Sequence, residues 1–170
     1  MPEANRNVWA PWRMEYIDSL AERDAGGCFL CRALAAPEDD AGNHVLFRGE
    51  RTLVLLNKYP YSSGHLLVAP AVHESRFEAL PEDMLLELML RMRDAKRVLE
   101  QALHAQGFNI GLNLSHCAGA GLPEHLHWHV VPRWQGDTNF MPVLGDVKVI
   151  PEALDRTYEK LRTAATELGL

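Results

Sequence analysis

The segment at residues 125–131 constrains the fold of this chain more than any other, because its residue types alternate strictly. It reads His-Leu-His-Trp-His-Val-Val, so histidines occupy positions 125, 127 and 129. On a β-strand, alternate side chains point to the same face. The pattern therefore predicts a strand with three imidazoles on one face, and with Leu126, Trp128 and Val130 packed into a core on the other.

Three imidazoles on one face are costly to bury without partners, which argues against a purely structural role. Two functional interpretations compete, a metal cage and an array of nucleophile and acid. Residues two apart on a strand lie about 7 Å apart, and residues four apart about 13 Å. Zinc–nitrogen bonds are only about 2 Å long, so His125 and His129 cannot easily share one ion. At least one imidazole is therefore left for other chemistry.

That chemistry is predicted to be displacement at phosphorus. An imidazole is a good nucleophile there and a good leaving group afterwards, so it can divide a difficult displacement into two steps. A neighbouring imidazole that titrates near neutral pH can supply a proton to the leaving group. The Ala-Gly-Ala-Gly loop at 118–121 precedes the histidine strand, and backbone N–H groups of such loops can turn toward a phosphate.

The rest of the chain predicts one α+β domain of ordinary globular composition, with 47% hydrophobic and 24% charged residues. Apolar positions at helical spacing predict a long helix from Pro81 to about His104, and a final helix is expected over about 152–167. One long helix inserted among sequential strands predicts an antiparallel sheet of about five strands. The other predicted elements are strands at 45–48, 52–56, 65–69 and 108–114, and a short helix-compatible stretch at 14–22.

Charge and hydropathy narrow the classes of partner. The net charge of −6 argues against duplex binding, which needs a clustered basic face, although a small anionic ligand is not excluded. The first residues lack the apolar region of a secretory signal, and the apolar runs are too short to span a membrane. We therefore expect a cytoplasmic protein that binds neither nucleic acid nor membranes.

Two of the three cysteines, Cys28 and Cys31, form a C-x-x-C pair, whereas Cys117 stands alone. In a reducing cytosol such a pair indicates metal ligands or redox thiols before a structural bridge, and buried free cysteines are a further alternative. A structural zinc requires four nitrogen or sulfur ligands, so two more would have to come from elsewhere in the chain.

The histidine strand resembles the motif of the histidine triad (HIT) family, His-φ-His-φ-His-φ-φ, where φ is an apolar residue. The resemblance covers about residues 28–140 of a single domain, flanked by an N-terminal segment (1–27) and a C-terminal extension with a helix (141–170). Further matching segments lie at 56–60 and 64–68, which resemble the family's ribose-side strand and turn, and at 111–114, which resembles its phosphate side. Segments similar to the bacterial diadenosine polyphosphate phosphorylases lie at 9–13, 124–127, 132–134 and 136–140.

The resemblance implies a HIT-like fold that forms a homodimer with a continuous sheet, and an enzyme that cleaves the α-phosphate linkage of dinucleoside polyphosphates. It implies that His127 attacks the phosphorus to form a nucleotidyl-histidine intermediate, that His129 assists the leaving group, and that Asn57 binds ribose hydroxyls. The residues implied to hold the phosphates are Asn113, Gly119, Gly121 and Leu122. Fragile-histidine-triad hydrolases usually carry a glutamine where this chain has Gly121, so backbone groups would make more of these contacts here.

Zinc-bearing relatives, including galactose-1-phosphate uridylyltransferase, imply that His73 and His125 join Cys28 and Cys31 around a structural zinc. Phosphorolysis and hydrolysis both remain open. Two other functions are alternatives: a purine nucleoside phosphoramidase, and a zinc-stabilised nucleotide-binding module without turnover.

Overall fold

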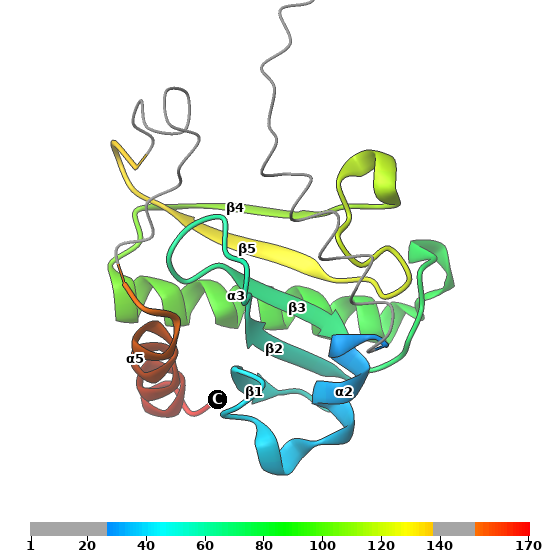
Figure 1. The fold of residues 1–170 in the computed structure, drawn as a ribbon, viewed down its shortest axis with the longest axis horizontal. Helices are drawn as coiled ribbons and strands as arrows, with labels where there is room; N and C mark the ends of the chain where they lie inside the picture. The colour runs from blue at the N-terminus through cyan, green and yellow to red at the C-terminus, as the bar shows by residue number, and fades with distance from the viewer. Residues whose placement is uncertain (1–26, 138–151) are drawn as a thin grey trace, which may run out of the picture.

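The structure, a computed structural model, describes residues 27–137 and 152–170. Its centre is a five-stranded antiparallel sheet with the strand order β1-β2-β3-β5-β4 (Figure 1). Because β5 is inserted between β3 and β4, the histidine segment leads into the interior of the sheet and not to its edge. The strands are β1 (Val45–Arg48), β2 (Thr52–Leu56), β3 (Leu66–Pro70), β4 (Gly107–Leu112) and β5 (Trp128–Arg133).

Three α-helices accompany the sheet in the described residues: α2 (Phe29–Ala35), α3 (Glu82–Leu103) and α5 (Leu154–Glu167). Short 3₁₀ turns are formed by Pro37–Asp39, Phe77–Ala79 and His116–Ala118. No helix in residues 27–137 and 152–170 is long and apolar enough to cross a membrane. The predicted α+β class, with an antiparallel sheet, one long helix and a C-terminal helix, is confirmed.

Several predicted boundaries need correction. The long helix begins at Glu82, one residue after Pro81, and ends at Leu103, where His104 takes a left-handed φ of 52° as the C-cap. The histidine strand begins at Trp128 and not at Leu126, because the N–H of Leu126 donates to the Glu74 carbonyl at 2.8 Å, outside the ladder. The helix-compatible stretch at 14–22 lies outside the described residues.

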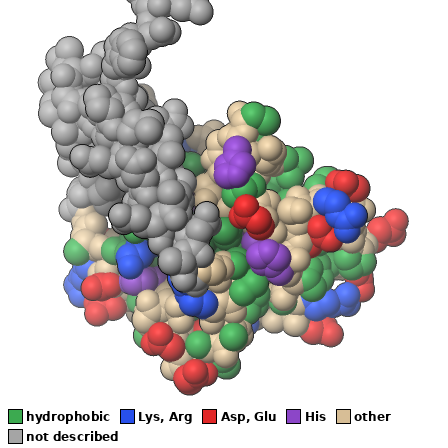
Figure 2. Space-filling view, turned by 45° about the vertical axis from the view of Figure 1, so that its right-hand side comes forward, with side chains coloured by type: hydrophobic (Ala, Val, Ile, Leu, Met, Phe, Trp, Pro, Cys, Tyr) green, Lys and Arg blue, Asp and Glu red, His purple; other side chains and the backbone are tan. Residues whose placement is uncertain are grey.

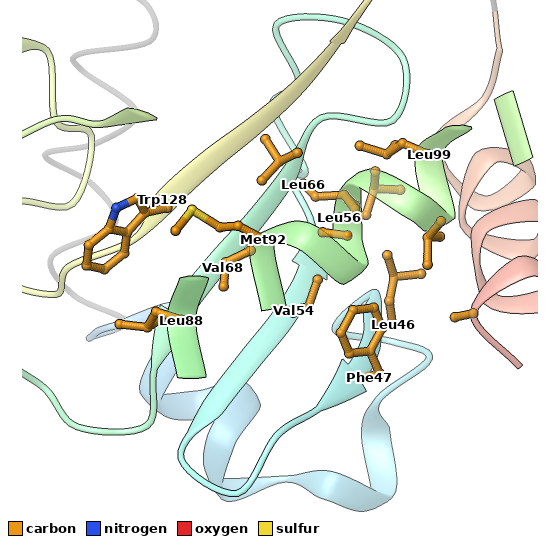
Figure 3. Close-up of a cluster of buried hydrophobic side chains, with 14 of the residues drawn as sticks. Leu46, Phe47, Val54, Leu56, Leu66, Val68, Leu88, Met92, Leu99 and Trp128 are labelled. Carbon is orange, nitrogen blue, oxygen red and sulfur yellow. The ribbon is translucent and has the colours of Figure 1, made fainter. Parts of the chain in front are cut away.

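Buried apolar side chains fill both faces of the sheet. On one face, α3 packs against alternate residues of the inner strands β2, β3 and β5, and α5 packs beside α3 against the edge strand β1 (Figure 3). Leu126, Trp128 and Val130 belong to this cluster, which confirms the predicted core face of the histidine segment. On the other face, α2 contributes Leu30 and Ala33 to a smaller cluster. The imidazoles of the histidine segment therefore share their side of the sheet with α2.

Gly64, two residues before the start of β3, allows a close approach of the chain to α3. Its φ is +78°, and a Cβ added there would lie 2.4 Å from Leu103 Cδ1 and 3.0 Å from Leu99 Cδ2. Gly136 has the same φ of +78°, but a Cβ there would meet nothing within 4 Å. An added side chain would therefore strain the backbone at both positions, but it would overlap with neighbouring atoms only at Gly64.

We expect Gly64→Ala to reduce the free energy of unfolding by about 1–3 kcal/mol more than Gly136→Ala, because only the first adds a steric overlap to the left-handed strain. Urea unfolding of both variants measures the difference. Equal losses would contradict the packing described for Gly64.

Candidate functional site

The histidine segment and the residue directly before β3 form one imidazole cluster, which comprises His65, His127 and His129. β3 and β5 are antiparallel with Leu67 opposite His129, so residues of β3 at odd positions share the face of His129. The ring centroids of His65 and His129 are 5.1 Å apart, and those of His127 and His129 are also 5.1 Å apart. Two segments separated by 64 residues thus meet at a single site.

The protonated nitrogen of His127 follows from its hydrogen bond. Its Nδ1 lies 2.9 Å from the main-chain carbonyl of His125, and because a carbonyl only accepts, Nδ1 carries the proton. In the neutral ring Nε2 then holds a lone pair. His127 is buried, with 6% of its surface exposed, and this burial lowers its pKa below 6.5. His127 is therefore a neutral imidazole with an available nucleophilic nitrogen.

A chain of hydrogen bonds gives His129 the opposite tautomer. The backbone N–H of Tyr61 donates to His65 Nδ1 at 3.0 Å, so the proton of His65 lies on Nε2. That Nε2 donates to His129 Nδ1 at 2.9 Å, which leaves the proton of His129 on its own Nε2. The Nε2 of His129 is buried and has no hydrogen-bond partner among the described residues. The site thus places an acceptor nitrogen on His127 beside a donor N–H on His129.

His65 is the functional residue that sequence reasoning missed. The residue patterns predict only that it begins a strand, and they assign it no chemical role. A signal does exist, because antiparallel pairing of the third and histidine strands puts His65 on the imidazole face. His65 is fully buried and is also 3.2 Å from Asn57 Nδ2 through its Nδ1.

Burial also lowers the pKa of His129, to about 4, with a smaller contribution from the charge of His127. In the unfolded chain the imidazole titrates near 6.5, so between pH 6.5 and about 4 the unfolded state binds a proton that the folded state does not. The contribution of His129 to stability is therefore complete above pH 6.5 and is lost as the pH falls toward 4.

We accordingly expect the urea concentration at the unfolding midpoint to decrease as the pH is lowered below about 6.5. The pH dependence of the free energy of unfolding should correspond to up to one fewer proton taken up on unfolding in His129→Asn than in the wild type. Urea unfolding at several pH values between 7.5 and 4.5 measures both slopes. Parallel pH dependences in the two proteins would contradict a neutral, desolvated His129.

The structure places the predicted substrate-binding residues in two loops around this cluster. Asn57 follows β2 and contacts His65 as described above. In the loop between β4 and β5, Asn113 Nδ2 lies 3.4 Å from the Gly119 carbonyl, and Gly119 has a φ of +88°. Leu122 packs against the smaller apolar cluster beside α2, and Gly121 directly precedes it. Whether these residues bind substrate stays a prediction.

The four predicted metal ligands, Cys28, Cys31, His73 and His125, converge. Their ligand atoms all lie within 4.8 Å of one another. His125 Nδ1 lies 3.2 Å from Cys28 Sγ and 3.5 Å from Cys31 Sγ, and His73 Nδ1 lies 3.2 Å from Cys31 Sγ. A tetrahedral zinc would separate a sulfur and a nitrogen ligand by about 3.5 Å. The donor set and its spacing therefore fit a structural Cys₂His₂ zinc site.

The tautomer of His125 suits metal binding. Its Nε2 lies 2.9 Å from the Pro70 carbonyl and must donate to it, so Nδ1 offers a lone pair toward the two thiols. Burial and the neighbouring Cys28 raise the pKa of Cys31 to about 11. Two adjacent thiols resist ionisation unless a cation lies between them, so a bound metal would hold both as thiolates. Sequence reasoning did not predict helix α2, which carries Cys31 and begins next to Cys28.

Charged groups on the described surface are mixed. On the face shown in Figure 2, Lys and Arg side chains lie among Asp and Glu, with histidines between them. Elsewhere in the described residues as well as on this face, positive charges lie close to negative ones; Arg48, for example, pairs with Asp40, and Arg51 pairs with Asp83. This face therefore carries no broad basic patch among its described residues.

Known proteins that are similar to this chain also contain a histidine triad domain. The chain matches the HIT domain over residues 38–136. It is 40% identical over 163 residues to a protein of Mycobacterium tuberculosis named AP-4-A phosphorylase, a match that covers 93% of this chain and 83% of that protein. It is also 31% identical over 96 residues to the bis(5'-nucleosyl)-tetraphosphatase (asymmetrical) of Schizosaccharomyces pombe, covering 56% of this chain and 52% of that protein.

A solved structure of a zinc-bound histidine triad protein from Mycobacterium smegmatis superposes with a TM-score of 0.67 at 26% identity, covering 84% of this chain and 96% of that one. The HIT domain match over residues 38–136 includes β1 to β5, the long helix and the complete histidine segment. Because the HIT domain match covers more than half of the chain and includes the histidine segment, the chain belongs to the HIT domain family.

Proposed function

We propose that this protein is an enzyme that cleaves dinucleoside polyphosphates, of which diadenosine tetraphosphate is the example, at an α-phosphate through a nucleotidyl-histidine intermediate. The observation that carries this proposal is the pair of opposite tautomers, with a lone pair on His127 Nε2 beside an N–H on His129 Nε2. The relatives named AP-4-A phosphorylase and bis(5'-nucleosyl)-tetraphosphatase support the substrate class.

In the first step, the Nε2 lone pair of His127 attacks the α-phosphorus. A P–N bond forms, and the bond from phosphorus to the bridging oxygen breaks. The electron pair of that bond goes to the leaving polyphosphate, whose oxygen accepts a hydrogen bond from His129 Nε2–H. The Nδ1–H of His127 faces the His125 carbonyl, which stabilises the positive charge that develops on the attacking ring.

In the second step, an acceptor attacks the phosphorus from solution, and the P–N bond breaks with its electron pair returning to His127 Nε2. Inorganic phosphate as acceptor yields a nucleoside diphosphate, and water, which releases a proton to the solvent, yields a nucleoside monophosphate. The 40% identity to the M. tuberculosis AP-4-A phosphorylase favours phosphate.

Substrate would be held by the two loops that flank the imidazoles. Asn57, whose amide lies against His65, would bind ribose hydroxyls. Asn113 and the backbone of Gly119, Gly121 and Leu122 would bind phosphate oxygens. Loops of this kind offer N–H groups that point toward an anion.

The zinc would act on the reaction through structure. Zinc holds its thiolate and imidazole ligands at fixed distances, and His125 is both one of these ligands and the residue whose carbonyl accepts from His127. Binding of the metal would thus fix the backbone that orients the nucleophile. No step of the displacement requires the metal itself.

We also propose that the protein is a homodimer whose sheets join through β4. This strand is one edge of the sheet, its Ile110 is 49% exposed, and Met89 of α3 is 62% exposed. Open strand edges beside apolar side chains favour pairing with another strand. Sedimentation should give a dimer for the wild type and a larger monomer fraction for Ile110→Lys, and a monomeric wild type would contradict the proposal.

Product analysis tests the function and separates it from its alternatives. Diadenosine tetraphosphate is incubated with the protein with and without inorganic phosphate, and the nucleotides are separated. We expect ATP and ADP when phosphate is present and no ADP without it; ATP and AMP in both cases would instead identify a hydrolase. Faster turnover of an adenosine phosphoramidate would identify a phosphoramidase, and binding without turnover of either compound would identify a nucleotide-binding module.

A further inference from the structure

Tyr61 lies across the hydrogen-bonded pair of His65 and His129. Its ring centroid is 5.6 Å from that of His129, with the two planes at 27°, and 4.5 Å from that of His65, with the planes at 35°. Among the described residues, it is the one aromatic ring besides the histidines that contacts His129. The side chain is nevertheless 46% exposed, so it lies between the imidazole pair and the surface.

The same residue makes a second contact through its backbone. The N–H of Tyr61 donates to His65 Nδ1 and so fixes the tautomer of His65. His65 in turn fixes the tautomer of His129 through its own Nε2–H. Tyr61 therefore contacts the His65–His129 pair twice, once through its backbone N–H and once through its ring.

Together these contacts limit how the His129 ring can turn. The hydrogen bond from His65 fixes one atom of the ring, Nδ1, but still permits the ring to tilt about that contact. The Tyr61 ring packs nearly parallel to one face, and His127 meets His129 edge-on at 72°. Aromatic pairs of these geometries are stabilising. The direction of the His129 Nε2–H is therefore set by Tyr61 as well as by His65.

We propose that Tyr61 is a positioning residue for the departure of the leaving group: its ring keeps His129 Nε2–H aimed at the bridging oxygen. This inference rests on the proposed function, in which that N–H contacts the leaving oxygen. Hydrogen bonding to the leaving oxygen matters most when the leaving group is a strong base. Loss of the Tyr61 ring should therefore slow poor leaving groups more than good ones.

Two aryl esters of AMP, the 4-nitrophenyl and the phenyl ester, test this directly, because they differ in the acidity of the phenol released. The proteins compared are the wild type, Tyr61→Phe, which keeps the ring, and Tyr61→Ala and Tyr61→Leu, which remove it but retain the backbone N–H. Leu86→Ala is the control, since Leu86 lies on α3, outside the two loops that would hold substrate, and is exposed at 62%. Urea midpoints confirm that each variant is folded.

We expect Tyr61→Ala and Tyr61→Leu to lower kcat on the phenyl ester by roughly 30-fold or more, but on the 4-nitrophenyl ester by less than about 5-fold. Tyr61→Phe and Leu86→Ala should stay within about 3-fold of the wild type on both esters. Equal losses on the two esters, or a loss in Tyr61→Phe as large as in Tyr61→Ala, would overturn the role of the ring. A wild type that cleaves neither ester nor diadenosine tetraphosphate would instead overturn the proposed function.

Discussion

Replacing His127 with glutamine should lower kcat on diadenosine tetraphosphate by at least about 1,000-fold, because the amide has no lone pair of comparable nucleophilicity at the position of Nε2. Glutamine keeps a polar group near the His125 carbonyl, which now accepts from His127 Nδ1, so the variant should remain folded. Steady-state kinetics and the urea midpoint measure the two effects.

The matched control for this variant is His104→Asn. His104 is an exposed histidine at the C-terminus of α3 with a left-handed φ of 52°, a conformation that asparagine tolerates well. We expect its kcat to stay within about 2-fold of the wild type. Binding of a non-cleavable dinucleotide analogue to His127→Gln should also be retained, and substantial turnover by a folded His127→Gln would rule out His127 as the nucleophile.

Removing one thiolate ligand should have the second large effect. We expect Cys28→Ser to lose zinc and to lower the Tm by roughly 5–10 °C, because metal binding contributes directly to the stability of the segment that it crosslinks. The ligands come from distant parts of the chain, with Cys28 and His125 separated by 97 residues. Because the His125 carbonyl holds the nucleophile, kcat should fall more than KM rises. Thermal unfolding, elemental analysis and kinetics on the same preparation check the three effects.

Cys117→Ser is the control for this experiment, because Cys117 is exposed and lies outside the group of metal ligands. It should retain one zinc per chain and the Tm of the wild type. A wild-type protein purified without chelators that contains no zinc, or a Cys28→Ser variant with unchanged Tm and metal content, would contradict the proposed centre.

The sequence predicted the part of this site that depends on alternation. A strict two-residue period determines which side chains share a face, so it correctly assigned Leu126, Trp128 and Val130 to the core. The rise of a strand also indicates that His125 and His129 lie too far apart to share one metal ion easily. The structure agrees, since His125 faces the cysteines while His129 hydrogen-bonds to His65.

What the sequence could not supply were the contacts between distant segments. The tautomers of His127 and His129 depend on a main-chain carbonyl and on the backbone N–H of Tyr61, and backbone partners of this kind leave no pattern in residue types. Helix α2 was missed because its seven residues are too few to display a helical period. Its stability depends on tertiary contacts, through Leu30 and Ala33, that become apparent only in the folded chain.

The roles of Asn57, Asn113 and the glycine loop, the domain boundaries, the cytoplasmic location and the lack of nucleic-acid or membrane partners stay predictions. The substrate-binding residues can be tested singly, and Asn57→Ala would be expected to raise KM.

The central claim is a covalent bond between His127 and a nucleotide, and the most direct measurement is to trap it. The protein is mixed with diadenosine tetraphosphate without phosphate, quenched within the first turnovers at alkaline pH, where phosphohistidine-type bonds are stable, digested and analysed by mass spectrometry. We expect one adenylyl group on the peptide that contains residues 125–129, localised to His127 and removed when phosphate is added before the quench. An adenylyl group on another residue, or turnover in the same sample without any protein-bound nucleotide, would contradict this mechanism.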